Sequence, residues 1–142
     1  MAMNNIALFD LYVGKILAKL YNTFPLKVEI DVCEMTGLSI DEESMNIPKE
    51  CQIFNDTMEW LHESGYLYYQ QSYPYAFSRV VLSAKGLEVL KSTPQSLQQK
   101  DGIGETLRDA VAHGKNELIR LSVNTILSHG TTLAFGAMAG QS

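Results

Sequence analysis

The residue types that most often carry catalysis or bind metals are few and scattered in this chain. The histidines are His62, His113 and His129, and the cysteines are Cys33 and Cys51. The HExxH motif of zinc proteases places two histidines one helical turn apart, and that spacing is absent. Neither cysteine has a basic neighbour that would favour the thiolate, and no CxxC or Cys/His spacing occurs. The sequence therefore predicts neither a metal site nor a nucleophilic cysteine.

A glycine-containing segment, DGIGETLRDAVAHGK at residues 101–115, invites comparison with a phosphate-binding loop. Such a loop follows a strand and carries a GK[ST] signature or a complete glycine fingerprint. The preceding TPQSLQQK is not a strand pattern, and Gly102 and Gly104 alone carry little weight. Glu105 in the first turn of a helix is a sufficient explanation of the pattern. We therefore predict a protein that is not an enzyme, has no cofactor and takes no small-molecule substrate.

Composition indicates one soluble domain, with or without an appendage. The 142 residues are 46% hydrophobic and 19% charged, which is enough to bury a core. Many of the aromatic residues lie between Phe54 and Phe77, and this predicts where much of that core forms. The net charge of −5 opposes general nucleic-acid binding, which depends on Lys and Arg. Isolated cysteines and the absence of a basic, apolar leader predict a cytoplasmic protein.

Apolar residues recur at steps of three and four, the period of an amphipathic helix, in several segments. A short additional helix at VCEMTG is predicted between Asp31 as N-cap and Gly37 as C-terminal stop. Ser83 is a plausible N-cap for the third of the longer helices. These longer helices are expected at residues 6–21, 48–64 and 84–92.

Strand patterns separate these helices. Residues 26–30 alternate apolar and polar, whereas residues 66–70 and 77–82 are rich in aromatic and β-branched side chains. The intervening QSYPYA reads as a hairpin loop, and the acidic segment at residues 39–48 reads as an exposed loop. The predicted order is helix, strand, short helix, helix, β-hairpin, helix, which is an α+β fold.

The stretch HESGYLYYQQ, followed by FSRVVLSAKGLEVL, resembles winged helix-turn-helix regulators of the PadR and MarR kind. In those proteins a recognition helix ends in Gly-Tyr, and the hairpin's second strand leads into a Leu-Thr/Ser-x-x-Gly helix start. The matching residues here are Gly65, Tyr66, Leu82, Ser83 and Gly86. The resemblance implies a winged-helix domain at residues 1–92, a linker at 93–102, and a long C-terminal helix with a short apolar tail at 103–142.

In the winged-helix order, residues 48–64 are the recognition helix, which usually enters the major groove of DNA. Its predicted outward face is acidic, and carboxylates repel the phosphate backbone. We therefore expect this protein to bind another protein through the recognition helix and the hairpin. The expected contact residues are Glu50, Asp56, Glu59, Glu63, Tyr73 and Tyr75.

The alternative is a DNA-binding transcriptional regulator of PadR/MarR type, in which nucleic acid is the partner. Tyrosines of the wing would then contact sugars or stack on bases. The residues expected at the DNA are Lys49, Asn55, Arg79 and Lys85.

Small and apolar residues recur at helical spacing from residue 103 to about 128 and predict one long helix there. In winged-helix regulators a helix appended after the wing often mediates dimerisation, and the resemblance implies a homodimer here. The expected interface residues are Leu107, Val111, Gly114, Leu118, Leu121, Leu133 and Phe135.

The last part of the chain, LSVNTILSHGTTLAFGAMAG at residues 121–140, has no formally charged side chain. A membrane span needs about 20 predominantly apolar residues. The polar SHGTT at residues 128–132 interrupts this one, and we expect the helix to end there. Membrane association is therefore a remote alternative. The apolar segment beyond the interruption is expected to be covered either by the protein's own core or by a partner.

Overall fold

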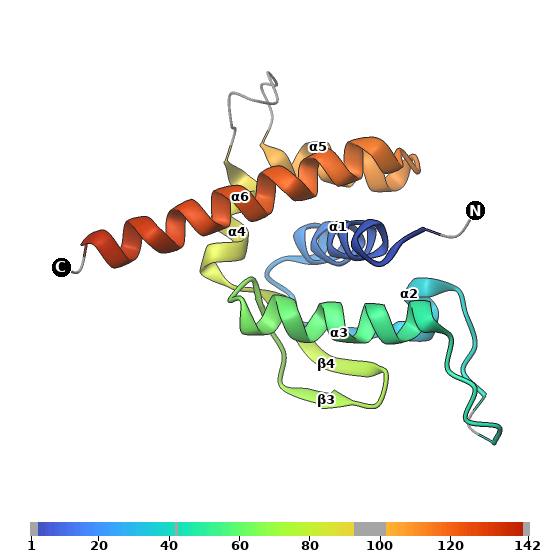
Figure 1. Ribbon diagram of the computed structural model, residues 1–142. Helices are drawn as coiled ribbons and strands as arrows, with labels where there is room; N and C mark the ends of the chain where they lie inside the picture. The colour runs from blue at the N-terminus through green and yellow to red at the C-terminus, as the bar shows by residue number, and fades with distance from the viewer. Residues whose placement is uncertain (1–2, 42, 93–101, 141–142) are drawn as a thin grey trace.

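The computed structural model describes residues 3–41, 43–92 and 102–140, with side chains described as far as Thr131. It is an α+β fold, in which helices lie on one side of a small antiparallel sheet (Figure 1). The central helix α1 packs against α3, α5, α6 and β4, so that elements from both ends of the chain share it.

The helices of the N-terminal half begin and end where the sequence predicts. Asn4 caps α1 by accepting a hydrogen bond from Ala7 N at 2.8 Å, and Asp31 caps α2 through Glu34 N at 2.9 Å. Gly37 ends α2 in the left-handed conformation, with φ of 74°. The bounds are α1 (Asn5–Thr23), α2 (Val32–Thr36) and α3 (Lys49–Glu63).

The sheet is antiparallel, with β4 in the centre and β1 on one side of it. On the other side β2 and β3 follow one register: Leu67 pairs with Leu82 and Ser72 with Phe77. The strand β3 falls within QSYPYA, so the expectation of a loop there is wrong, and the turn itself is only Pro74 and Tyr75. The bounds are β1 (Val28–Asp31), β2 (Leu67–Tyr68), β3 (Gln71–Tyr73) and β4 (Ala76–Leu82).

The C-terminal part contains α4 (Ala84–Lys91), α5 (Ile103–Ala112) and α6 (Asn116–Gly140). Ser83 caps α4 by accepting from Gly86 N at 3.0 Å. The expectation of one helix from residue 103 to 128 is wrong, because the chain turns at Gly114, whose φ is 64°. The expected stop at SHGTT is also wrong, because α6 runs through these residues to Gly140. The predicted linker lies almost entirely outside the described residues.

One hydrophobic core joins the N-terminal helices, the sheet and the C-terminal helices. Leu17 and Ile16 of α1 lie in the same buried cluster as Leu107 of α5 and Val123 of α6. The close approach of α6 to α1 depends on Gly14, where an added Cβ would lie 2.5 Å from Ile119 Cγ2. Among the described helices none is long and apolar enough to cross a membrane.

Candidate interaction surfaces

The outward side of α3 carries three exposed carboxylates, Asp56, Glu59 and Glu63, which we call the acidic stripe. The opposite side of the helix is buried and includes Phe54 and Leu61. Burial first, and then the carboxylates of Glu59 and Glu63, raise the pKa of the nearby Tyr69 hydroxyl. Glu59 and Glu63 of the acidic stripe therefore lie close to Tyr69, between β2 and β3.

Trp60 lies on α3 beside the acidic stripe and is 40% exposed. The expectation that the central aromatic cluster marks core misses this residue. Its ring is edge-on to Phe9 with centroids 5.1 Å apart and stacks on Tyr66 at 6.3 Å. These neighbours hold the indole in place while one of its sides stays open. In the sequence, the available signal was the position of Trp60 next to Glu59 on the polar side of a helix.

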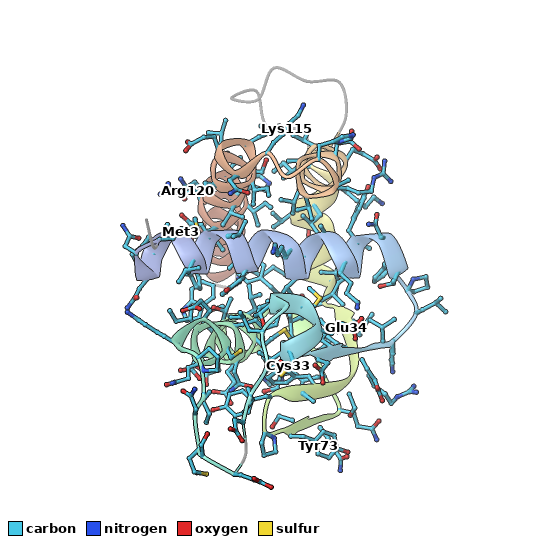
Figure 2. The ribbon with its side chains drawn as sticks, turned by 90° about the vertical axis from the view of Figure 1, so that its right-hand side faces the viewer. Met3, Cys33, Glu34, Tyr73, Lys115 and Arg120 are labelled. Carbon is cyan, nitrogen blue, oxygen red and sulfur yellow. The ribbon has the colours of Figure 1, made fainter. Side chains whose placement is uncertain are left out.

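The other predicted partner-binding residues lie elsewhere. Glu50 is half-buried in the first turn of α3, where it contributes to the raised pKa of Tyr12 after burial itself. Tyr73 is exposed at the hairpin, far from Arg120 of α6 and from Lys115, which lies between α5 and α6 (Figure 2). Tyr75 is half-buried, and its carbonyl accepts a hydrogen bond from Val32 N at 3.0 Å. Of the six predicted residues, only Asp56, Glu59 and Glu63 therefore belong to the acidic stripe.

The four residues predicted for DNA contact do not form one surface through any described interaction. Lys85 donates from Nζ to Ser64 O at 2.9 Å and lies 4.4 Å from the centroid of the Tyr66 ring, so it supports the end of α3. Asn55 is half-buried, and its Oδ1 is buried without a hydrogen-bond partner among the described residues. Lys49 is exposed at the start of α3, and Arg79 is exposed on β4.

The residues predicted for the oligomer interface are divided between core and surface. Leu107 is completely buried in the protein's own core, whereas Val111 and Leu118 are half-buried. Gly114 lies in the exposed turn between α5 and α6, and Leu121 is 52% exposed. Leu133 and Phe135 belong to α6, but their side chains lie outside the described part of the structure.

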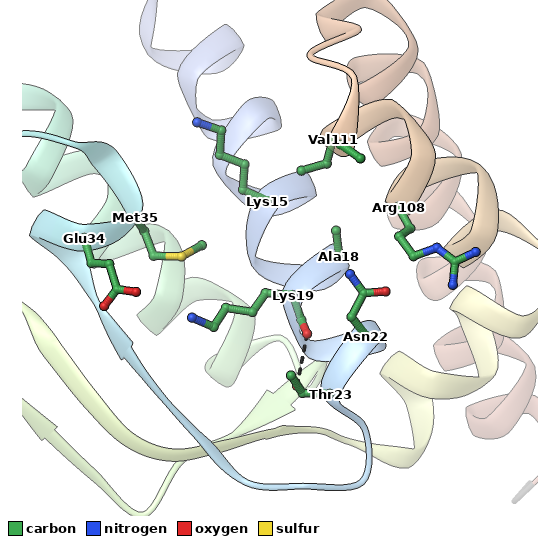
Figure 3. A pocket seen from close by; sticks show the side chains of 10 residues that line it. Lys15, Ala18, Lys19, Asn22, Thr23, Glu34, Met35, Arg108 and Val111 are labelled. Carbon is green, nitrogen blue, oxygen red and sulfur yellow. Dashed lines mark hydrogen bonds between the residues drawn. The ribbon is translucent and has the colours of Figure 1, made fainter.

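A hollow of about 510 Å³ lies between α1, α2 and α5. Lys15 and Lys19 extend from α1 toward Met35 and Glu34 of α2, whereas Arg108 points away on the α5 side (Figure 3). Arg108 is ion-paired with Glu105. The cations therefore do not converge on one point, and the hollow does not form a single anion site.

The described residues contain no group of three or more His, Cys, Asp or Glu that could hold a metal ion. His62 packs on the Tyr69 ring with centroids 4.4 Å apart, and His113 Nδ1 lies 2.8 Å from Asp109 O. Both histidines therefore have structural neighbours and no adjacent nucleophile among the described contacts.

Comparison with known proteins gives no relative from which a function could be transferred. No family model matches the chain, and no curated protein and no solved structure matches it.

Proposed function

We propose that this chain is a non-enzymatic winged-helix protein that acts by binding another protein with a basic and partly apolar surface. The observation that carries this proposal is the acidic stripe of α3 beside the half-exposed Trp60. Partly buried tryptophans surrounded by polar residues are frequent anchors of protein interfaces. Carboxylates around such an anchor attract Lys and Arg on a partner and speed its association.

The winged-helix assignment is supported by the strand order. The strand β4 lies between β1 and the β2–β3 edge, so the N-terminal strand pairs with the second strand of a hairpin. The helix α3 precedes this hairpin, which is the position of the recognition helix in winged-helix proteins. Three carboxylates on its outer side favour a cationic partner over a phosphate backbone.

A second part of the proposal is a homodimer formed through α6. This helix carries no charged residue after Arg120, and its ribbon extends past α4, away from α1 and α5 (Figure 1). An uncharged helix end that leaves the body of a protein is unfavourable in water unless another surface covers it. The free thiols of Cys33 and Cys51 support a reducing compartment, and we propose the cytoplasm as its location.

The binding proposal is tested with a defined probe, a synthetic helical peptide with lysines on one face and leucines on the other. Trp60 is the only tryptophan in the chain, so its fluorescence reports directly on binding at α3. We expect a change in Trp60 emission and an affinity that falls with added salt. The triple variant Asp56→Asn, Glu59→Gln, Glu63→Gln should bind the peptide about tenfold or more weakly, since three charge contacts are removed.

The matched control neutralises three exposed carboxylates on other elements, Glu29→Gln, Glu88→Gln and Glu117→Gln, and changes the net charge equally. This control should keep its affinity. Equal loss in both triple variants would mean that only net charge matters and would refute a specific surface. Sequence-specific binding of a DNA duplex, with no response to the peptide, would replace the proposal by the PadR/MarR-type regulator.

A further inference from the structure

A second hollow, of about 390 Å³, opens on the outer face of the sheet. The buried side chains of the sheet, including Ile30, Phe77 and Val80, point toward the helices, which lie on the other face (Figure 1). The volume is within the usual range of small-ligand sites. The residues that line this hollow are Lys27, Tyr68, Tyr69, Gln70, Arg79 and Val81.

The two cations reach this hollow from neighbouring strands. Lys27 precedes Val28, whose partner on β4 is Val80, and Arg79 is the residue before Val80. Both side chains are exposed, and neither forms an ion pair within the described residues. In a protein with an excess of acidic residues, two unpaired cations at one hollow form a local site for an anion.

The backbone at Arg79 is strained. Its φ of 52° is in the left-handed region, which is unfavourable for a residue with a Cβ. The register of β1 against β4 shifts at this point, because Val28 pairs with Val80 while Ile30 pairs with Phe77. Such a bulge re-aims the side chain of the extra residue, and glycine would fit it with less strain. A left-handed backbone favours glycine, so the fold alone does not explain an arginine at this position, whereas contact with a ligand does.

An aromatic ring completes the hollow on the opposite side of β4. Tyr68 pairs with Val81 and is 58% exposed, whereas its neighbour Leu67 is fully buried. An exposed tyrosine ring on a strand is a surface on which a planar base can stack. The side-chain amide of Gln70 adds hydrogen-bond donors and an acceptor beside it.

We propose that this hollow binds a nucleoside phosphate. Arg79 and Lys27 contact the phosphate, because a guanidinium fork and an ammonium group are the side chains best suited to phosphate oxygens. The base stacks on Tyr68, and Gln70 is placed for hydrogen bonds to the base edge. The site lies on the sheet and not on α3, although its lining residue Tyr69 is close to Glu59 and Glu63 of the acidic stripe. It does not depend on the function proposed above.

The test is a titration of the isotopically labelled protein with adenosine monophosphate, followed by amide NMR. We expect shifts of the signals from Tyr68 to Gln70 and from Lys27 and Arg79. Inorganic phosphate should bind more weakly, because it offers no base to Tyr68. Saturable shifts elsewhere, or none at millimolar nucleotide, would overturn the proposal.

The decisive variant is Arg79→Gly, for which binding and stability should change in opposite directions. Loss of the guanidinium should weaken nucleotide binding about tenfold or more. The melting temperature should stay the same or rise, because glycine relieves the left-handed strain. A variant that melts earlier and still binds would show that Arg79 serves the fold alone.

Further variants separate the two parts of the ligand. Lys27→Met keeps the backbone of the bulge and should weaken phosphate and nucleotide binding alike. Tyr68→Leu should weaken binding of the nucleotide but not of phosphate. Lys15→Met, on α1, removes the same charge outside the hollow and should change nothing. Equal weakening by Lys15→Met would reduce the effect to net charge and overturn the site.

A nucleoside phosphate can be free or part of a single strand, and two arms of the titration distinguish these sources. A short single-stranded oligonucleotide that binds more tightly than adenosine monophosphate at the same signals would identify a strand as the source. Equal or weaker binding would identify the free nucleotide. A duplex hides its base faces and should bind more weakly than a single strand of the same length at the same salt concentration; the reverse order would contradict base stacking on Tyr68.

Discussion

At the scale of single residues, the ion pair between Asp10 and Arg120 joins α1 to α6. Asp10 is only 5% exposed, and its Oδ2 lies 3.6 Å from Arg120 Nε. A buried carboxylate depends on its partner, because a charge that is buried without a compensating charge destabilises the fold. The arginine is partly open to solvent, which lowers the strength of the pair relative to a fully buried one.

We predict that Arg120→Met lowers the free energy of unfolding by about 1–3 kcal/mol, because it leaves Asp10 buried and unpaired. The measurement is equilibrium unfolding in urea. Arg108→Met is the matched control, since Arg108 is comparably exposed but pairs with the more accessible Glu105 and Asp109. Its loss should cost under about 1 kcal/mol. Equal effects of the two substitutions would show that the buried position of Asp10 does not matter.

Trp60 shows how far residue-level prediction reached on α3. The alternation of polar and apolar residues gave the exposed positions of Asp56, Glu59 and Glu63. It did not give the environment of Trp60, because one of the rings against it, Phe9, comes from α1 and is distant in sequence. The contacts of Lys85 with Ser64 and Tyr66 could not be predicted either, because they depend on tertiary packing.

At the scale of elements, the position of α6 is fixed where Gly130 meets Tyr66. A Cβ added at Gly130 would lie 2.1 Å from the Tyr66 hydroxyl oxygen and 2.8 Å from Tyr66 Cζ. Contacts this short cannot form, so either the ring or the helix would have to move. The glycine thus allows α6 to pass directly over Tyr66, which follows the end of α3.

We predict that Gly130→Ala lowers the free energy of unfolding by about 1–3 kcal/mol, despite the better helix propensity of alanine. Adding Tyr66→Phe should recover part of this loss, because it removes the shortest contact. Urea unfolding of the two variants, and of Tyr66→Phe alone, gives the coupling between the positions. Strictly additive effects would indicate that α6 does not pack on Tyr66.

Element prediction succeeded where the signal was local and failed where it depended on packing. Asp31, Gly37 and Ser83 act within one helical turn, and each is a cap as expected. Gly114 was assigned to a helix because its neighbours keep the period, yet it adopts a left-handed turn. Gly130 lies in the predicted break, yet the helix continues through it. The residue at this position has no side chain because the Tyr66 ring occupies the space, and that contact is not visible in the sequence.

At the scale of the whole molecule, several buried hydroxyl and thiol groups link stability to alkaline pH. Burial is the main cause that raises the pKa of Tyr12, Tyr66, Tyr69 and Cys51. A raised pKa in the fold means that the unfolded chain loses these protons first. The stabilisation is therefore complete below the pKa values of the unfolded chain, about 8.5 for Cys and 10 for Tyr. It is lost as pH rises through the pKa values of the folded protein.

We predict that the free energy of unfolding falls as pH is raised above about 9 to 10. Urea unfolding across this range measures the slope. Tyr66→Phe removes one of these groups and should give a shallower slope, which separates its titration from the growing net negative charge. A slope that is unchanged in Tyr66→Phe would show that general charge repulsion, and not the buried hydroxyl, causes the alkaline loss.

The extension of α6 past α4 bears on the assembly of the whole molecule. Among the side chains of this helix that the structure describes, which end at Thr131, Ile119, Val123 and Ile126 are buried in the hydrophobic core. We predict that removal of residues 132–142 leaves these core residues in place and the melting temperature nearly unchanged. If the uncharged end is the dimer interface that we propose, the same deletion should convert a dimer into a monomer in light scattering.

Leu121→Asp, at an exposed position of the same helix, should weaken the dimer, because it would bury a charge in the interface. A full-length chain that is already monomeric, or a mass that neither change alters, would contradict dimerisation through α6.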